Sequence, residues 1–335
     1  MDVLPIFTEN YQANHRIVSF CPRGISNESK FCYFNASLQV LLNENTFLNL
    51  LRSLKDSFSE NELQQLPFSR NFLLLSEELR KYGVKSRNSS PIDAREIKFT
   101  SYVSSGRFAE GVQEDASEVL HFLINKLHDE MISTTSMGIS ETPISSMFFG
   151  AVDRNGANTG DIFTVLPVEI SHERVLTVED ALLRTFRAPQ FCVAGQQVIV
   201  DRFSSLPDIL LLQLKIFKFS KRHGQMKMFK KIQLTQDLTI PEQILSESLQ
   251  ALPLQTRKYC LTSVIYHSGE DMTYGHYTAD CYHSGRKGWI NYDDTHLSEV
   301  DHPNVQQNNV DDSPYILVYR RYQSNSSNKR RRRRN

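Results

Sequence analysis

The stretch GISNESKFCYFNASLQVLLN, residues 24–43, decides how the rest of the chain is interpreted. Its second half predicts a helix, because Leu38, Leu41 and Leu42 recur at helical spacing behind Cys32. The unpaired N–H groups and the dipole at a helix start favour an anion, so a thiolate would be stabilised at Cys32. A lone cysteine at a helix start is also common as a buried structural residue. A catalytic interpretation therefore needs a base and an orienting group elsewhere in the chain.

Composition indicates a globular chain with a large core. Of its 335 residues, 40% are hydrophobic and 23% are charged. Its five cysteines are few, odd in number and widely spaced, so we expect a reducing cytosolic or nuclear compartment. The densest apolar run, near residue 210, is too short to span a bilayer, and residues 1–12 lack the order of a secretory signal. We therefore expect no membrane association.

Positive charge is concentrated at the C-terminal end. The net charge is +0, but positions 329–334 hold six basic residues, so the remaining residues carry −6. The run SNSSNKRRRRRN has no apolar residue, which predicts a disordered basic tail over 324–335. KRRRRR could serve as a nuclear import signal, as a contact for RNA or a membrane surface, or as a solubilising end without a partner. The folded body lacks basic stripes, so we expect nucleic-acid binding only through this tail.

The first half of the chain predicts helices. Apolar residues recur at helical spacing over 35–54 and, more clearly, over 115–131, where Asp115 is placed to cap the helix. The segment between them, 85–111, is polar and interrupted by proline and glycine. It predicts loop and short turns.

The second half predicts strands with one short helix among them. The helix is expected at 177–186, where Thr177 can cap it and Glu179 and Asp180 suit its first turn. A helical half followed by a strand-rich half predicts an α+β fold with a cleft where the two meet. The expected strands are short runs rich in β-branched and aromatic residues at 161–170, 196–203, 208–217, 259–266, 276–283, 288–292 and 315–320.

One predicted hairpin offers a base and an orienting acid for Cys32. If 276–283 and 288–292 pair as antiparallel strands, His276 comes close to Asp293. The alternative is an incidental histidine beside a turn that contains two acids. The hairpin alone therefore does not decide whether His276 is catalytic, and the rest of the chain is needed to decide it.

Three segments together resemble the signature boxes of the ubiquitin-specific proteases. They are GISNESKFCYFNASLQVLL around Cys32, GVQEDASEVL at 111–120, and the segment around His276 that ends in GWINYDD. LPDILLLQLKIFKF and SPYILVY also resemble segments of that catalytic domain, and the likeness spans about 24–320. The resemblance implies a papain-like cysteine protease with a helical thumb, an antiparallel β palm and reduced fingers. The implied boundaries are an N-terminal extension at 1–23 and a catalytic domain at 24–323, with the thumb at 24–143 and the palm with short fingers at 144–323.

The resemblance implies a role for each residue of the catalytic group. Cys32 matches the nucleophile, and His276 matches the general base. Asp293 matches the acid that holds the imidazole, while Asp294 matches a second acid with a helper role. Asn27 matches the side-chain donor that steadies the oxyanion, and such a donor is typically worth about 2.7–4 kcal/mol in the transition state.

The second box and a neighbour of the base are implied to bind the tail of ubiquitin. Gln113, Asp115 and Glu118 match the residues that receive this basic tail, and carboxylates suit an arginine-bearing peptide. Asp115 could instead only cap its helix, or do both. Tyr277 matches the aromatic residue that walls the channel for the terminal glycines; otherwise it is an ordinary strand residue.

Residues just before the nucleophile depart from the family pattern. Ser29 stands where glycine is usual, and serine would cost about 1 kcal/mol if φ is positive there. Lys30 could favour the thiolate, or could point to solvent without effect. Phe31 replaces a threonine. The fingers region contains Cys192 but no Cys-x-x-Cys pair, so we expect no zinc and no other cofactor.

These features predict a cysteine protease that hydrolyses the (iso)peptide bond after the C-terminal glycine of ubiquitin through a thioester. Ubiquitin and ubiquitinated proteins are the expected partners, and we expect a monomer in the cytoplasm, the nucleus or both. Two alternatives stay open: a weak or inactive ubiquitin-binding scaffold, and a protease for another ubiquitin-like modifier.

Overall fold

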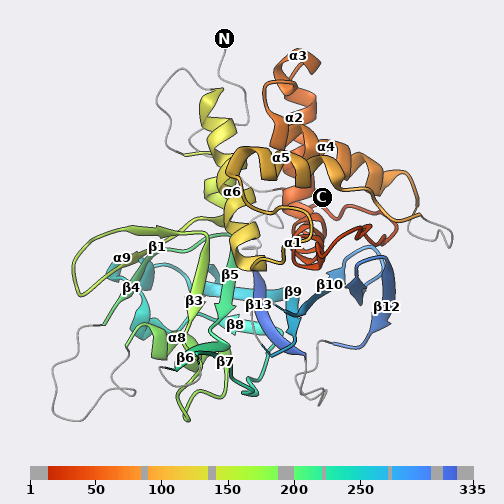
Figure 1. Cartoon of the computed structure of the whole chain (residues 1–335). Helices are drawn as coiled ribbons and strands as arrows, with labels where there is room; N and C mark the ends of the chain where they lie inside the picture. Colours follow the sequence, from red (N-terminus) through yellow and green to blue (C-terminus); the bar gives the residue numbers. More distant parts are fainter. Residues whose placement is uncertain are drawn as a thin grey trace, which may run out of the picture.

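The computed structural model describes residues 14–83, 90–134, 141–187, 200–220, 224–270, 274–302 and 312–322. Helices form the first part of the chain and strands most of the second (Figure 1). The helices are α1 (Cys32–Leu42), α2 (Asn45–Ser57), α3 (Glu60–Leu63), α4 (Pro67–Arg80), α5 (Arg95–Ser105), α6 (Ala116–Ser133), α7 (Pro143–Phe148), α8 (Val178–Thr185) and α9 (Glu247–Gln250), with short 3₁₀ helices η3 (Glu242–Ile244) and η4 (Leu254–Arg257). The mixed α+β architecture that the sequence predicts is confirmed.

Helix α1 is the centre of the helical part. Every one of its residues is buried, and it packs against α6 on one side and β10 on the other. A helix buried all round needs its polar side chains satisfied internally. Ser37 Oγ accordingly donates to the Ala116 carbonyl at 3.1 Å, and Gln39 Nε2 donates to the Arg23 carbonyl at 2.8 Å.

The helix predicted over 115–131 is confirmed, while other parts of the helical prediction are corrected. Asp115 caps α6 by accepting from the Ser117 N–H. The region 85–111, expected to be loop, contains α5. The buried residues of this helix are Ile97, Lys98 and Ser101, of which only Ile97 is aliphatic. So small an apolar stripe gives little helical periodicity. The helical part also includes α7, which ends at Phe148.

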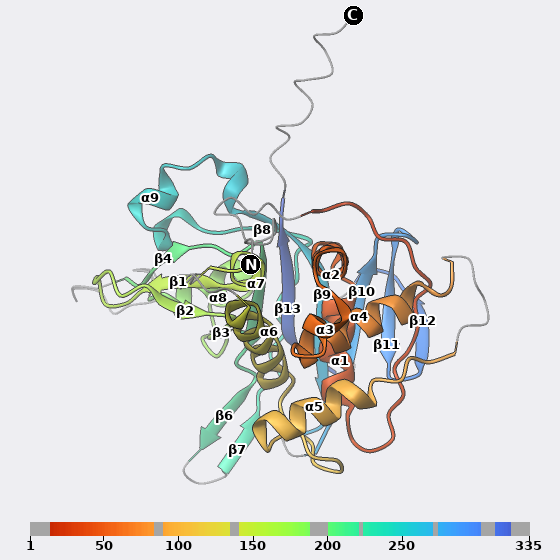
Figure 2. The ribbon, with the colours of Figure 1, turned by 90° about the horizontal axis from the view of Figure 1, so that it is seen from above.

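The palm is a single sheet built from strands that come from both the beginning and the end of the strand-rich half of the chain. Its order is β12-β11-β10-β9-β13-β5-β3, with β8 also paired to β9, and the helical part stands over it (Figures 1 and 2). Most neighbours are antiparallel as expected, but β3 pairs with β5 in parallel. Its strands are β3 (Val165–Val168), β5 (Ile209–Leu214), β8 (Asp237–Thr239), β9 (Lys258–Ser268), β10 (His276–His283), β11 (Gly288–Asp293), β12 (His296–Val300) and β13 (Ser313–Arg321).

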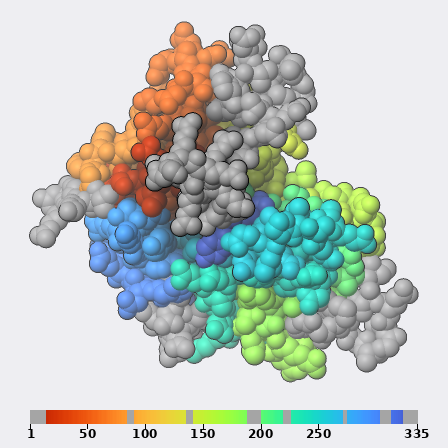
Figure 3. All heavy atoms as spheres, turned by 180° about the vertical axis from the view of Figure 1, so that it is seen from behind, coloured from red at the N-terminus to blue at the C-terminus, as the bar shows by residue number. Residues whose placement is uncertain are grey.

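Two small sheets lie beside the palm. One has the order β2-β1-β4 and the other pairs β6 with β7. From behind, the later part of the chain, in blue and cyan, lies below the N-terminal part, in orange (Figure 3). The strands of the small sheets are β1 (Gly150–Asp153), β2 (Asp161–Phe163), β4 (Arg202–Ser205), β6 (Phe217–Ser220) and β7 (Gly224–Lys227). Part of the strand expected at 196–203 lies outside the described residues.

A buried carboxylate ties this fingers-like region together. Asp201 is 1% exposed and accepts from Arg154 Nη1 at 3.1 Å and Arg187 Nη2 at 3.2 Å. Its other oxygen accepts from the backbone N–H of Asn155 at 2.8 Å. Because a buried charge must be paired, Asp201 links the turn after β1 to the segments that flank residues 188–199. Within the described ranges, no helix is long and apolar enough to cross a membrane.

Candidate active site

Cys32 is the first residue of α1 and is 4% exposed. The helix begins at Cys32, as the sequence predicts, and the Phe31 carbonyl accepts its first bond, from the Asn35 N–H at 2.8 Å. The N-cap residue Phe31 makes no side-chain cap, and the first turn carries no acid. The positive end of the helix therefore acts on the thiol without an acidic residue in the first turn of the helix itself.

His276 begins β10 and lies within hydrogen-bonding reach of both Cys32 and Asp293. The predicted hairpin is confirmed, since β10 pairs with β11 in antiparallel register from Ala279↔Tyr292 to His283↔Gly288. His276 Nε2 lies 2.6 Å from Asp293 Oδ1, which leaves Nδ1 for the thiol. The hydrogen bond with Cys32 raises the pKa of His276 most, burial opposes it, Asp293 adds to it, and the pKa reaches about 9. The imidazolium therefore persists at neutral pH beside Cys32.

Asp294 does not share the imidazole with Asp293. Its carboxylate accepts from Asn27 Nδ2 and from Asn35 Nδ2, each at 2.7 Å. The other end of the Asn27 amide accepts from the Phe31 N–H at 2.9 Å. Asp294 thus orients the predicted oxyanion donor and links it to α1.

The loop before Cys32 is held against the turn that carries Asp294. The Ile25 N–H donates to the Asp294 carbonyl at 2.8 Å, and a Cβ on Gly24 would collide with that carbonyl. The residue with positive φ in this loop is Lys30, at 52°, so the condition under which Ser29 would be strained is not met. The Lys30 side chain is exposed, in line with the alternative that it points to solvent.

Gln113 binds the backbone next to the base. Its Nε2 donates to the Gly275 carbonyl at 2.8 Å and its Oε1 accepts from the Gly275 N–H at 3.2 Å. A side chain at position 275 would collide with the His267 ring and the Ser268 carbonyl. Gln113 therefore ties the start of α6 to the residue that precedes His276.

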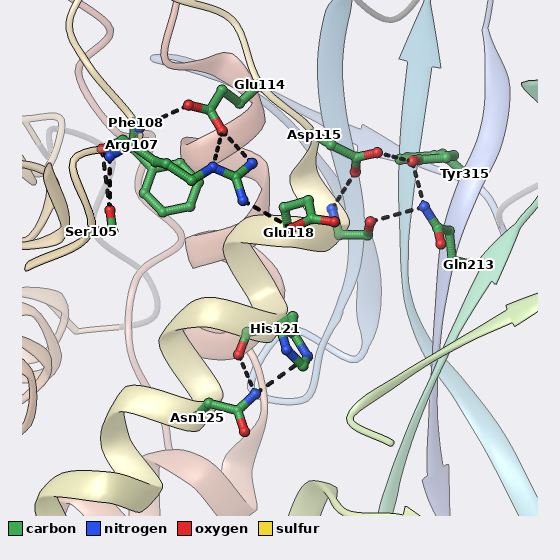
Figure 4. Close-up of polar contacts among 11 residues, drawn as sticks. Ser105, Arg107, Phe108, Glu114, Asp115, Glu118, His121, Asn125, Gln213 and Tyr315 are labelled. Atoms are coloured by element: carbon green, nitrogen blue, oxygen red, sulfur yellow. Dashed lines mark hydrogen bonds and ion pairs between the residues drawn. The ribbon is translucent and has the colours of Figure 1, made fainter. Parts of the chain in front are cut away.

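The acids of the second box have partners within the chain (Figure 4). Arg107 donates to Glu114 at 2.6 Å and to Glu118 at 3.1 Å. Asp115 caps α6 and also accepts from the Tyr315 hydroxyl. A basic peptide that approached Glu114 and Glu118 would therefore compete with Arg107 for them.

The match to a known family covers most of the chain. Residues 23–319 match the profile of the family described as Ubiquitin carboxyl-terminal hydrolase. This chain belongs to the ubiquitin carboxyl-terminal hydrolase family. Cys32, His276 and Asp293 all lie inside the matched region, as does the Asn27–Asp294 pair.

Relatives and solved structures agree with this membership in the ubiquitin carboxyl-terminal hydrolase family. Ubiquitin carboxyl-terminal hydrolase 10 of Gallus gallus is 26% identical over 396 residues, covering 93% of this chain and 50% of the relative. Probable ubiquitin carboxyl-terminal hydrolase 3 of Schizosaccharomyces pombe is 24% identical, covering 90% and 74%. The SAGA Ubp8/Sgf11/Sus1/Sgf73 DUB module bound to ubiquitin aldehyde has a similar fold, with a TM-score of 0.70 at 19% identity and coverage of 91% and 70%. The chain spans about half the length of the first of these relatives.

Tyr277, which the family resemblance places at the channel for the terminal glycines, is buried together with His267. Tyr277 is 1% exposed, and its ring lies 4.8 Å from that of His267 and 6.1 Å from that of Tyr315. In this conformation the buried Tyr277 ring packs against His267 and Tyr315, and its contact with a substrate stays a prediction. His267 is fully buried in the same aromatic cluster, so His276 is the histidine that is placed to act as the base.

The metal prediction concerns residues that are only partly described. Within the described ranges, His276, Asp293 and Asp294 are the one group of three side chains spaced for a metal ion. Their atoms are engaged in the hydrogen bonds given above. Cys192 lies outside the described residues, so the absence of a zinc site stays a prediction.

Sequence reasoning missed several residues that shape this family's site here. Asn35 sits three residues after Cys32 and reads as one more position of a helix. Tyr315 lies in a strand pattern, and Lys98 lies in a segment predicted to be loop. The sequence signal was Asn35 itself, which is one of several polar residues, with Ser37 and Gln39, on a helix that is fully buried and therefore needs internal partners for them.

Proposed function

We propose that this chain is a deubiquitinating cysteine protease that hydrolyses the (iso)peptide bond after the C-terminal glycine of ubiquitin. The observation that carries the proposal is the arrangement of three side chains. Cys32 lies at a helix start, His276 lies within hydrogen-bonding distance of it, and Asp293 lies 2.6 Å from the imidazole. The Ubp8 module of similar fold was solved with ubiquitin aldehyde, which supports ubiquitin as the substrate.

In the first half-reaction the Cys32 thiolate attacks the carbonyl carbon after the terminal glycine. The negative charge moves to the carbonyl oxygen, where Asn27 has a second N–H to donate because Asp294 accepts only one. His276 then gives its proton to the amine as the C–N bond breaks. A thioester with Cys32 and a free amine result.

In the second half-reaction water replaces the thiolate. The now neutral His276 takes a proton from water, which attacks the thioester carbonyl. The C–S bond breaks, the new carboxyl group releases its remaining proton to solvent so that ubiquitin leaves with a free carboxylate, and the thiolate–imidazolium pair is restored. Asp293 holds the ring in one tautomer through both halves.

The test is hydrolysis of a fluorogenic amide at the C-terminus of ubiquitin. We expect wild-type chain to release the fluorophore, and Cys32→Ala to release none while it still binds ubiquitin. A wild type that binds ubiquitin without hydrolysis would establish the scaffold instead. Parallel substrates built on ubiquitin-like modifiers test the other alternative, since faster hydrolysis of one of them would replace ubiquitin in the proposal.

We propose also that the chain acts as a monomer in the cytoplasm and nucleus. The basic run at 329–334 supports nuclear entry. Light scattering in solution tests the mass, where a value near 38.6 kDa is expected. Imaging of a fluorescent fusion tests the location, and a fusion without 324–335 should lose nuclear signal.

A further inference from the structure

Lys98 is a buried lysine beside the loop that carries the oxyanion donor. It lies on the inner face of α5 and is 6% exposed. Lysine is almost never so buried unless the ammonium group has partners, because desolvation of its charge is costly. Nothing in the triad mechanism uses this residue.

The partners of Lys98 are the two ends of the loop at 26–31. Its Nζ donates to the Ser26 carbonyl at 3.1 Å, and it lies 4.9 Å from the centroid of the Phe31 ring. Ser26 directly precedes Asn27, and Phe31 directly precedes Cys32. The Ser26 carbonyl also accepts from Asn35 Nδ2 at 3.3 Å, so helices α1 and α5 both hold it.

The charged groups around Lys98 already have other partners. Asp294 accepts from Asn27 and Asn35. Asp93 pairs with Arg95 at 2.6 Å, and Glu28 lies 3.8 Å from the same guanidinium. In the part of the chain that the structure describes, Lys98 has no ion pair of its own, and its charge is directed to a carbonyl and a ring.

The environment lowers the pKa of Lys98. Burial is the largest cause; Asp294, Glu28 and Asp93 oppose it, and the pKa falls to about 8. Lys98 is therefore protonated at neutral pH, and it loses its proton as pH rises through about 8. Loss of that proton would weaken both contacts, because a cation interacts with a carbonyl and with an aromatic face more strongly than an amine does.

We propose that Lys98 is a positioning residue for the reaction at Cys32, holding both ends of the loop that presents Asn27 and Phe31. This inference rests on the proposed function. The ammonium group holds the Ser26 carbonyl, which lies in the peptide bond to Asn27, while Asp294 holds the Asn27 side chain, so that Asn27 is held through both its backbone and its side chain.

Two variants separate the position of Lys98 from its charge. Lys98→Met keeps the length and apolar stem and removes the charge; Lys98→Arg keeps the charge at every accessible pH. A cavity of about 490 Å³, lined in part by Lys98, Phe31 and Phe99, gives the larger guanidinium room. Lys126→Met is the matched control, because that lysine also lies over a ring, 6.0 Å from the centroid of Phe122, but far along α6.

Hydrolysis of the fluorogenic ubiquitin amide is measured for each variant. Removal of a direct oxyanion donor costs 10²–10³ in kcat, so we expect a smaller loss of roughly tenfold for Lys98→Met, which acts through the loop. KM should stay unchanged, and Lys98→Arg and Lys126→Met should keep most of the wild-type kcat. Equal kcat for Lys98→Met and wild type would overturn the proposal.

The pH profile is a readout that a merely structural role would not move. In wild type, kcat should fall as pH rises through about 8, where Lys98 loses its proton. In Lys98→Arg this limb should disappear, leaving the fall near pH 9 set by His276. The same limb in wild type and Lys98→Arg would overturn the proposal even if Lys98→Met folds poorly. A wild type without any hydrolysis would instead overturn the proposed function.

Discussion

We predict that Asp294 supports the oxyanion by orienting Asn27, and that it does not orient the imidazole of His276. The perturbation is Asp294→Ala, which removes the carboxylate that accepts from Asn27 and Asn35, each at 2.7 Å. The Asp293–His276 bond at 2.6 Å is left intact. We expect kcat for the ubiquitin amide to fall while KM and the pKa of His276 stay unchanged.

The size of the fall follows from the two hydrogen bonds. A hydrogen bond to a charged group contributes about 1.5–3 kcal/mol, and each 1.36 kcal/mol is a factor of ten in rate. The loss cannot exceed the whole contribution of an oxyanion donor, about 2.7–4 kcal/mol. Because Asn27 keeps its bond with the Phe31 N–H, we expect a fall of roughly 10- to 100-fold.

Steady-state hydrolysis gives kcat and KM, and alkylation of the thiol by iodoacetamide across pH gives the state of the thiol and imidazole. Asp294 has φ of 52°, which costs alanine about 1 kcal/mol but costs glycine nothing. Asp294→Gly is therefore the matched control: it should show the same fall in kcat with a smaller loss of thermal stability. Asp293→Asn should instead shift the alkylation profile.

Two results would refute this reasoning. One is wild-type kcat in both Asp294 variants, which would mean that Asn27 needs no second anchor. The other is an alkylation profile in Asp294→Gly that shifts as much as in Asp293→Asn, which would place Asp294 on the imidazole.

Three further predictions follow from the site and the fingers. Replacement of Cys32 by alanine should lower the pKa of His276 from about 9, as measured by NMR, because the bond with Cys32 is its largest cause; an unchanged value contradicts this. The contribution of this raised pKa to the free energy of unfolding is present below the ordinary value near 6.5 and is lost as pH rises through about 9. In Cys32→Ala the free energy of unfolding should lose most of this pH dependence. Arg107→Gln should free Glu114 and Glu118 to bind the basic tail of ubiquitin. Because exposed ion pairs contribute about 0.2–1 kcal/mol and are screened by salt, KM should fall by up to about fivefold at low salt and should not fall at high salt. An equal fall of KM at both salt concentrations would contradict a competition between Arg107 and ubiquitin. Asp201→Ala should reduce the free energy of unfolding by about 1–3 kcal/mol, with a lower Tm, whereas a chelator should leave the wild-type Tm unchanged; a Tm that falls with chelator would indicate a structural metal.

Local patterns in the sequence predicted the parts of the site that lie within one element. The cap at Asp115, the start of α1 at Cys32 and the β10–β11 hairpin depend on residues a few positions apart, where spacing alone is informative. The capping of α8 by Thr177 belongs to the same class, since Thr177 and Asp180 form a capping box.

Contacts between distant elements could not be predicted in this way. Asn35 and Asp294 are 259 positions apart, and nothing in either segment indicates the other. Helix α5 escaped prediction because its inner face holds Lys98 and Ser101, which look like solvent-facing residues. The burial of Lys98 is explained only once the loop at 26–31 and the carbonyl of Ser26 are in place to accept the ammonium group.

We expect Cys32 to act as a thiolate nucleophile that His276 activates. Reaction with a ubiquitin probe that carries a C-terminal electrophile, followed by peptide mapping with mass spectrometry, tests this claim most directly. We predict a single adduct on Cys32 that is absent in Cys32→Ala and forms about 10²–10⁴ times more slowly in His276→Ala. An adduct on any of the other four cysteines, or an equal rate in His276→Ala, would contradict it.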